Sequence, residues 1–248
     1  MDQTTAASAL RDKLRGEGLW MAWFSIGSVP VMELGVRAGF DAAVVDLQHG
    51  LWDRLSAHLA VSASGATPVL ARTASATPEA IGEALDSGAV GVIVPLIETA
   101  AQAASVVAAT NFPPRGNRSG GGVRPVGEGF ANYWRRSAAP IVGVMIETVA
   151  GLHNAAEIAR TPGLDLVFIG PGDLALSIGC FPELDARHEE ACQAILQACR
   201  AAETPCGIFT FNATAARARL EEGYAAAVAA NDIEVVASGF AAGRRGIE

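Results

Sequence analysis

The sequence predicts an α/β protein of the (β/α)8 TIM-barrel class with a short N-terminal helix. Eight short apolar segments alternate with segments that carry helix signals, and the pattern runs through nearly all of the 248 residues. The apolar segments are continuous rather than alternating with polar residues, which is typical of strands buried on both faces of a parallel sheet. Strand–helix units of roughly 30 residues each fill the length that such a barrel requires. We therefore expect residues 1–248 to form a single barrel domain without an internal boundary.

The predicted elements follow one another in strand–helix pairs after a short amphipathic helix at residues 6–14. Several helix boundaries carry clear signals: Pro30 opens one helix and Gly39 ends it, while Thr77 and Pro78 supply the N-cap and first turn of another. The predicted strands are 19–24, 42–47, 68–72, 90–95, 141–146, 166–169, 206–209 and 224–229. The predicted helices are 30–38, 52–62, 77–86, 100–109, 149–159, 187–202, 213–222 and 233–242. A short helical piece is expected after Asp173, and another helix around 130–136 inside an irregular segment at 111–139.

A doubly wound open sheet is the alternative architecture for such a strand–helix alternation. It is disfavoured because no G-x-G-x-x-G motif follows the first strand. Gly170-Pro171-Gly172, which follows the sixth predicted strand, is only a weak match to that motif.

Charge and composition limit the possible partners and location. A formal net charge of −8 and a pI near 5.1 argue against a nucleic-acid surface, which needs clustered cations. The first 19 residues contain no secretory apolar region, and no apolar run approaches the roughly 20 residues of a membrane span. The four cysteines show neither CxxC nor zinc-type spacing, which favours buried free thiols in a reduced, cytoplasmic protein. We expect partners that are neither nucleic acids nor membranes.

Polar residues gather where the predicted strands end, which is where barrels of this kind carry their chemistry. They are Asp46, Gln48, His49, Arg72, Glu98, Glu147, Asp173, Asn231 and Asp232. Glu147 and Asp173 end successive strands without a histidine or cysteine ligand nearby, a pattern that suits a hard, oxygen-loving ion such as Mg²⁺ or Mn²⁺. The alternative is that either carboxylate only caps or opens the helix that follows it.

His49 and Arg72 add a base and an anion-binding group to this predicted mouth. Asp46 stands three residues before His49 and can orient the histidine and raise its basicity. Arg72 closes an apolar strand, where its guanidinium needs an anion such as a carboxylate or phosphate. Local hydrogen bonding by His49 and a structural salt bridge by Arg72 are the alternatives. Asp86, considered alone, is a solvated acid at a helix end.

The three other histidines, His58, His153 and His188, fall in helical stretches, so we expect them at surface or packing positions. A cation, an anion clamp and a base can together polarise a carbonyl and remove a proton. The spacing alone does not choose between enolisation, lyase and hydrolase chemistry.

Several motifs in the same order resemble the HpcH/HpaI aldolase family, the metal-dependent class II pyruvate aldolases of the phosphoenolpyruvate/pyruvate barrel superfamily. The resemblance covers about residues 19–237. The motifs are Val45-Asp46-Leu47-Gln48-His49-Gly50, Gly91-Val92-Ile93-Val94-Pro95-Leu96, Phe112-Pro113-Pro114-Arg115-Gly116, Met145-Ile146-Glu147-Thr148 and Phe168-Ile169-Gly170-Pro171-Gly172-Asp173-Leu174.

The resemblance implies a role for each matching residue. Glu147 and Asp173 match the metal-binding carboxylates, and Arg72 matches the arginine that holds the pyruvate-derived oxygen. His49 matches the histidine of proton transfer, and Asp46 matches the acid beside it. Asp86 matches an aspartate that forms a dyad with the histidine across a subunit contact. The turn at Gly170, Gly172 and Asp173 would offer backbone N–H groups to a substrate carboxylate.

The implied activity is the reversible cleavage of a 4-hydroxy-2-oxo acid to pyruvate and an aldehyde, with Mg²⁺, Mn²⁺ or another divalent cation such as Co²⁺. The implied assembly is a homohexamer, a trimer of dimers in which the last helix packs on a neighbour. A CoA-ester lyase of the citramalyl- or malyl-CoA type and a non-catalytic acid-binding barrel are the alternatives. The chain departs from the family pattern at Met145, where many members carry glutamine, and at Gly172, where alanine or serine is usual.

Overall fold

The computed structural model describes residues 3–127, 129–137 and 139–245 and contains a closed barrel of eight parallel strands in the order β1 to β8. The strands are β1 (Leu19–Phe24), β2 (Ala42–Asp46), β3 (Val69–Arg72), β4 (Gly91–Val94), β5 (Ile141–Ile146), β6 (Leu166–Ile169), β7 (Cys206–Ile208) and β8 (Ala226–Asn231). Every strand pairs with its sequence neighbour, and β1 pairs with β8 to close the ring. The predicted (β/α)8 barrel with its N-terminal helix is confirmed.

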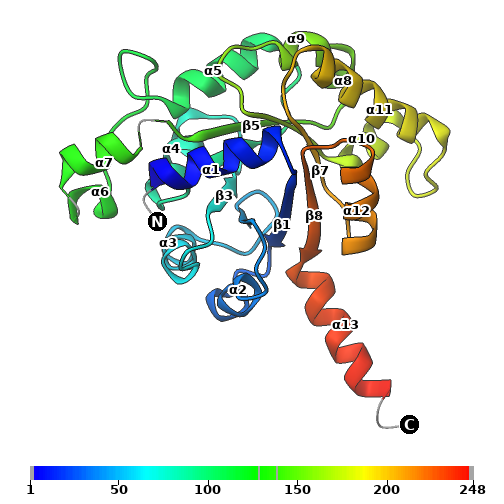
Figure 1. The fold of residues 1–248 in the computed structure, drawn as a ribbon, viewed down its shortest axis with the longest axis horizontal. Coiled ribbons are helices and arrows are strands. Elements are labelled where there is room, and N and C mark those ends of the chain that lie inside the picture. Colours follow the sequence, from blue (N-terminus) through cyan, green and yellow to red (C-terminus); the bar gives the residue numbers. More distant parts are fainter. Residues whose placement is uncertain (1–2, 128, 138, 246–248) are drawn as a thin grey trace.

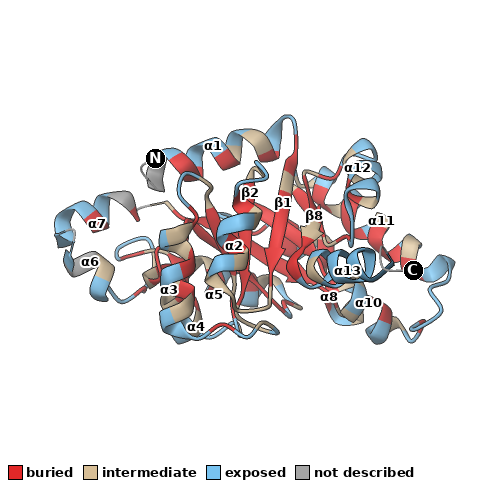
Figure 2. Ribbon diagram, turned by 90° about the horizontal axis from the view of Figure 1, so that it is seen from below, coloured by how far each residue is buried: buried red, intermediate tan, exposed pale blue. Residues whose placement is uncertain are grey.

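Helices cover the outside of this ring in Figures 1 and 2. They are α1 (Gln3–Arg15), α2 (Val29–Val36), α3 (Arg54–Ala63), α4 (Pro78–Asp86), α5 (Ala100–Thr110), α6 (Val123–Gly127), α7 (Phe130–Arg136), α8 (Val149–His153), α9 (Ala155–Ala159), α10 (Pro171–Ile178), α11 (Ala186–Ala201), α12 (Ala213–Glu221) and α13 (Asp232–Arg245). The strands are buried almost throughout, whereas the helices bury one face, as the continuous apolar pattern of the strands predicts.

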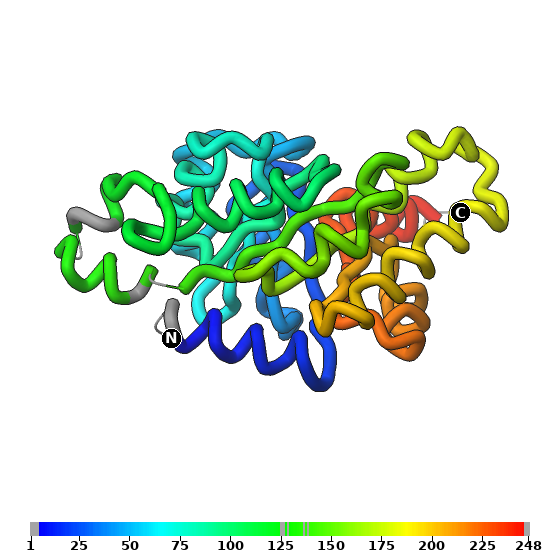
Figure 3. The backbone as a smooth tube through the Cα atoms, turned by 90° about the horizontal axis from the view of Figure 1, so that it is seen from above, coloured from blue at the N-terminus to red at the C-terminus, as the bar shows by residue number. Residues whose placement is uncertain are grey.

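The N-terminal helix α1 closes the end of the barrel at which the strands begin. Ala6, Ala7, Leu10 and Leu14 form a helical stripe that joins the same apolar cluster as the residues inside the barrel. The tube view in Figure 3 shows α1 lying along the lower edge of the molecule. Because this end is packed shut, the opposite end, where the strands finish, is the accessible mouth.

Lys13 lies on α1 and forms an ion pair with Asp41, which precedes β2. It is the single lysine of the sequence, whereas arginine accounts for the other 17 of the 18 basic residues. The lysine is therefore at the closed end of the barrel and far from the strand ends that form the mouth.

Several elements differ from the sequence expectation. Helix α6 lies in the segment at 111–139, where only a helix around 130–136 was expected. The helix expected at 149–159 is interrupted at Asn154, whose side-chain amide donates a 2.7 Å hydrogen bond to the carbonyl of Glu98. The last strand lies at Ala226–Asn231 rather than 224–229, because its register is set by pairing with β1. Helix α13 then leaves the barrel and projects from it (Figure 1), and residues 237–245 are all exposed.

The described residues contain no helix long and apolar enough to cross a membrane.

Candidate active site at the barrel mouth

The ends of β2 and β3 bring an acidic and a basic side chain together. Asp46 and Arg72 are register partners on these adjacent strands. Arg72 donates from Nε to Asp46 Oδ1 at 2.8 Å and from Nη2 to Oδ2 at 2.5 Å, a bidentate ion pair. The guanidinium carbon of Arg72 also lies 5.1 Å from the centre of the Trp23 ring. These contacts fix the arginine at the mouth with only 11% of its side chain exposed.

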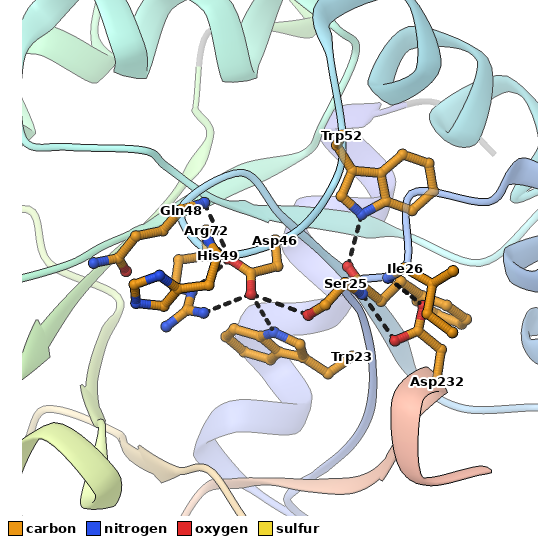
Figure 4. Close-up of polar contacts among 10 residues, drawn as sticks. Trp23, Ser25, Ile26, Asp46, Gln48, His49, Trp52, Arg72 and Asp232 are labelled. Carbon is orange, nitrogen blue, oxygen red and sulfur yellow. Dashed lines mark hydrogen bonds and ion pairs between the residues drawn. The ribbon is translucent and has the colours of Figure 1, made fainter. Parts of the chain in front are cut away.

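Asp46 is the centre of a larger hydrogen-bond network, drawn in Figure 4. Its carboxylate accepts bonds from the Trp23 indole at 3.3 Å and the Ser25 hydroxyl at 3.0 Å. It also accepts from the backbone N–H groups of Gln48 and His49, each at 3.1 Å. Asp46 therefore holds the backbone of the β2–α3 loop, and its bond to His49 goes to the main chain rather than to the imidazole.

Burial alone would raise the pKa of Asp46. The hydrogen bonds and the charge of Arg72 lower this pKa, and so do the hydrogen bonds that His49 and Trp23 donate. The net result is a pKa below the ordinary value of 3.8, so the carboxylate stays ionised beside the arginine. Trp23 and Ser25 were missed in the sequence because they lie in and just after an apolar strand. The polar N–H of a tryptophan near a strand end is a signal that could have indicated Trp23.

Glu147 directly follows β5 and is 1% exposed. Its Oε1 accepts a 2.8 Å bond from the backbone N–H of Leu96, a residue held at the positive φ of 58° that non-glycine residues rarely adopt. Its Oε2 has no hydrogen-bond partner within the described part of the chain. A buried carboxylate oxygen without a donor is costly unless a cation or ligand completes it.

Asp173 lies in the first turn of α10, opposite Glu147. Burial, followed by the nearby charge of Asp173, raises the pKa of Glu147 to about 7, while the Leu96 N–H and Arg72 oppose the rise. The turn that carries Asp173 is very close to Glu147, since a Cβ at Gly170 would lie 2.2 Å from Glu147 Oε2. Only glycine fits there.

Neither carboxylate is the helix cap that the sequence left open as an alternative. Thr148 caps α8 by accepting from the N–H of Gly151 at 3.0 Å, and Gly170 is the N-cap of α10. Asp173 is the third residue of α10 and makes no cap bond. Neither Glu147 nor Asp173 is therefore an N-cap, although Asp173 lies in the first turn of α10, where a carboxylate is favourable.

The donor set fits a hard divalent cation. Two carboxylates lie close enough to interact, the Oε2 of Glu147 is buried without a partner in the described residues, and glycine leaves room beside it. Among the residues that the structure describes, no group of three or more His, Cys, Asp or Glu side chains forms a complete metal cage. Such a pair suits an ion that keeps water and substrate in its remaining positions, as Mg²⁺ does.

His49 and Asp86 do not contact the two carboxylates, Glu147 and Asp173, in the described structure. The side chain of His49 is exposed beside Arg72 (Figure 4). Asp86 lies at the end of α4, where it pairs with Arg118 at 2.9 Å and accepts from the Tyr133 hydroxyl at 3.0 Å. A groove of about 720 Å³ on the outer surface of the barrel reaches from Leu47 to Asp86. Within one chain, Asp86 thus belongs to the outer face and not to the mouth.

Comparison with known proteins identifies the family. Residues 20–238 match the HpcH/HpaI aldolase/citrate lyase family. The chain belongs to this family. A HpcH/HpaI protein of Burkholderia cenocepacia has the same fold with a TM-score of 0.90 and 30% sequence identity, covering 96% of this chain and 98% of that one.

Two curated aldolases are also similar over most of their length. The hydroxypyruvate/pyruvate aldolase of Rhizorhabdus wittichii is 35% identical, over 87% of this chain and 88% of that protein. The 4-hydroxy-2-oxovalerate aldolase of Rhodococcus jostii is 37% identical, over 76% of this chain and 75% of that protein.

In this HpcH/HpaI chain, Met145 is 2% exposed and packs in the apolar cluster inside the barrel.

Proposed function

We propose that this protein is a class II pyruvate aldolase that reversibly cleaves a 4-hydroxy-2-oxo acid to pyruvate and an aldehyde. The observation that carries the proposal is the buried Glu147 with its unpartnered oxygen, facing Asp173 at the mouth of an HpcH/HpaI barrel. The names of the relatives from Rhizorhabdus and Rhodococcus agree with a carbon–carbon lyase that acts on oxo acids.

Glu147 and Asp173 would hold Mg²⁺ or Mn²⁺, and another divalent cation such as Co²⁺ would also suit two carboxylates. When bound, the ion supplies positive charge beside the keto oxygen and so favours enolate formation. Backbone N–H groups of Gly170, the N-cap of α10, and of Gly172, in its first turn, would bind the substrate carboxylate.

Arg72 stabilises the oxygen on which negative charge develops. Its bonds to Asp46 use Nε and Nη2, so Nη1 is the nitrogen that remains for the substrate oxygen. Because Asp46 and Trp23 already fix the guanidinium, little reorganisation is needed as the enolate forms.

His49 is the proposed base, because its imidazole is exposed beside Arg72 on a loop whose backbone Asp46 holds. It takes the proton of the C4 hydroxyl while the C3–C4 bond breaks. The electrons of the O–H bond form the aldehyde carbonyl, and those of the C3–C4 bond form the enolate. Protonation of C3 then gives pyruvate.

Class I chemistry requires a lysine that forms a Schiff base. The only lysine of the sequence, Lys13, is ion-paired with Asp41 at the closed end of the barrel. This position supports the metal-dependent route.

The proposal includes a homo-oligomer, a trimer of dimers in which α13 packs on a neighbouring copy. The apolar side chains of Ile233, Val235 and Phe240 on this projecting helix are 54%, 56% and 77% exposed. Asp86, on the outer face, would reach His49 only from a second copy. A cytoplasmic location agrees with the four free cysteines, all of which are buried.

The deciding experiment follows pyruvate release from a panel of 4-hydroxy-2-oxo acids with Mg²⁺ or Mn²⁺. We expect release that EDTA abolishes and that Glu147→Gln and Asp173→Asn each reduce by at least about 100-fold, as removal of a key electrostatic group does. Full activity in EDTA or in both variants would exclude the metal assignment. Tight binding of CoA thioesters would favour the CoA-ester lyase, and metal binding without any cleavage would favour the non-catalytic barrel.

A further inference from the structure

Helix α10, which carries the proposed metal- and substrate-binding turn, is held at its first residue by a histidine from another helix. His188 lies in the first turn of α11 and is 7% exposed. Its Nε2 lies 2.9 Å from the carbonyl oxygen of Pro171. Pro171 is the first residue of α10 and stands two residues before Asp173. The proposed reaction gives His188 no part.

The contact indicates which nitrogen of the imidazole is a hydrogen-bond donor. A carbonyl oxygen only accepts, so Nε2 carries the proton and donates it to Pro171. Cys192 lies one turn further along α11, with its Sγ 3.9 Å from the same nitrogen, and is fully buried. The ring is thus confined between the turn before Asp173 and the buried face of α11.

Helix α10 depends on such outside contacts for its position. It has only eight residues, and its N-cap, Gly170, offers no side chain to close the first turn. Toward its other end, Ser177 accepts a 2.9 Å bond from the backbone N–H of Val149, two residues after Glu147. Helix α11, by contrast, has 16 residues and buries a full apolar face, so it provides a rigid support.

The turn from Gly170 into α10 cannot move far without disturbing Glu147. A Cβ at Gly170 would lie 2.2 Å from Glu147 Oε2, so the backbone before Asp173 and the carboxylate of Glu147 are already in contact. Metal–ligand distances are held to roughly 0.2 Å. A shift of Pro171 would therefore change the geometry in which the two carboxylates face one another.

We propose that His188 is a positioning residue that fixes Asp173 relative to Glu147 by holding the Pro171 carbonyl. It touches neither substrate nor ion. The inference rests on the proposed function, in which Asp173 is a ligand. Groups that orient metal ligands typically change metal affinity by about 10- to 100-fold when removed.

The test compares wild type, His188→Ala and His188→Gln, whose amide nitrogen can replace Nε2 as the donor. His153→Ala, at an exposed histidine on α8, is the control. Mn²⁺ affinity is measured from the paramagnetic signal of free Mn²⁺, and kcat and KM from pyruvate release. Hydrogen–deuterium exchange of residues 170–178 is followed in the metal-free protein, and thermal unfolding is recorded for each variant.

We expect His188→Ala to weaken Mn²⁺ binding by about tenfold, to lower kcat and to speed exchange in α10, while His188→Gln recovers most of each. Unchanged Mn²⁺ affinity and exchange in folded His188→Ala would overturn the proposal, as would a glutamine variant no better than the alanine one. If His188→Ala does not fold, the glutamine variant decides alone: near-wild-type Mn²⁺ affinity supports the proposal, and a tenfold loss overturns it. If wild type binds no Mn²⁺ and releases no pyruvate, the proposed function itself fails.

Discussion

Glu147 is 1% exposed, yet only its Oε1 has a hydrogen-bond donor in the described part of the structure. Burial and Asp173 raise its pKa from the ordinary 4.5 to about 7. The folded protein therefore holds this proton more tightly than the unfolded chain does. Between those two pH values, stability falls as pH rises, and above pH 7 the ionised carboxylate opposes folding of the metal-free protein.

We predict that Glu147→Gln stabilises the metal-free protein at pH 8 while abolishing pyruvate release. A shift from 4.5 to about 7 corresponds to about 3 kcal/mol as an upper bound. The gain should shrink as pH falls to 4.5, because wild-type Glu147 is then protonated. Thermal unfolding of both proteins in EDTA, from pH 5 to 8, measures the difference.

Mn²⁺ provides the internal control for this prediction. It should raise the melting temperature of wild type at pH 8 and leave that of Glu147→Gln nearly unchanged, since only wild type keeps both carboxylates. A variant less stable than wild type at every pH would contradict the assignment of an uncompensated buried charge.

Individual residues were predictable where a strand end marked them. Glu147, Asp173, Arg72 and Asp46 each follow or end an apolar run, so position alone directed attention to them. The contacts of Asp46 with Trp23 and Ser25 were not predictable, because they depend on how closely β1 lies against β2 once the barrel closes.

At the scale of an element, the turn from β6 into α10 combines two glycines with opposite surroundings. A Cβ at Gly170 would meet Glu147 Oε2, whereas a Cβ at Gly172 would meet nothing within 4 Å. The two positions lie two residues apart in the same turn, so they form a matched pair for mutation.

We predict that Gly170→Ala displaces the turn and lowers both Mn²⁺ affinity and kcat by at least about tenfold, as loss of ligand orientation does. Gly172→Ala should keep activity and stabilise the protein by about 0.5–1 kcal/mol, because alanine restricts the unfolded chain. Metal titration, kinetics and urea unfolding of both variants check this pair. Equal effects of the two substitutions would show that the close approach at Gly170 is not what fixes the turn.

The order of helices and strands could be predicted from the apolar pattern, whereas breaks within an element could not. The interruption at Asn154 arises from its bond to the carbonyl of Glu98, a contact between distant parts of the chain. The burial of His188 likewise depends on how α11 packs against α10, which a helical pattern does not reveal.

At the scale of the whole molecule, α13 departs from the barrel although its predecessor β8 completes it. Its first residue, Asp232, is well fixed, because its carboxylate accepts bonds from the N–H groups of Ser25 and Ile26, each at 2.9 Å. We propose that this helix, which is anchored at one end and mostly exposed, packs on another copy. The apolar pattern predicted this helix, and the family resemblance implied that it packs on a neighbouring copy rather than on its own barrel.

We predict that wild type sediments as a multimer and that Phe240→Glu shifts it to smaller species, because a charge would be buried in the contact. Leu184→Glu, at an exposed leucine between α10 and α11, should leave the assembly unchanged. Sedimentation velocity at micromolar concentration distinguishes the species. A wild type that sediments as single chains would exclude the proposed hexamer.

The scarcity of lysine has a practical consequence for handling this protein. Lys13 is 42% exposed, and its helix closes the barrel at the end opposite the mouth. A resin or sensor chip that couples to lysine side chains would therefore hold every molecule by the same pole, with the mouth turned toward the solution. In an assembly of identical copies, a cross-linker that joins two lysines could act only between the Lys13 side chains of two copies.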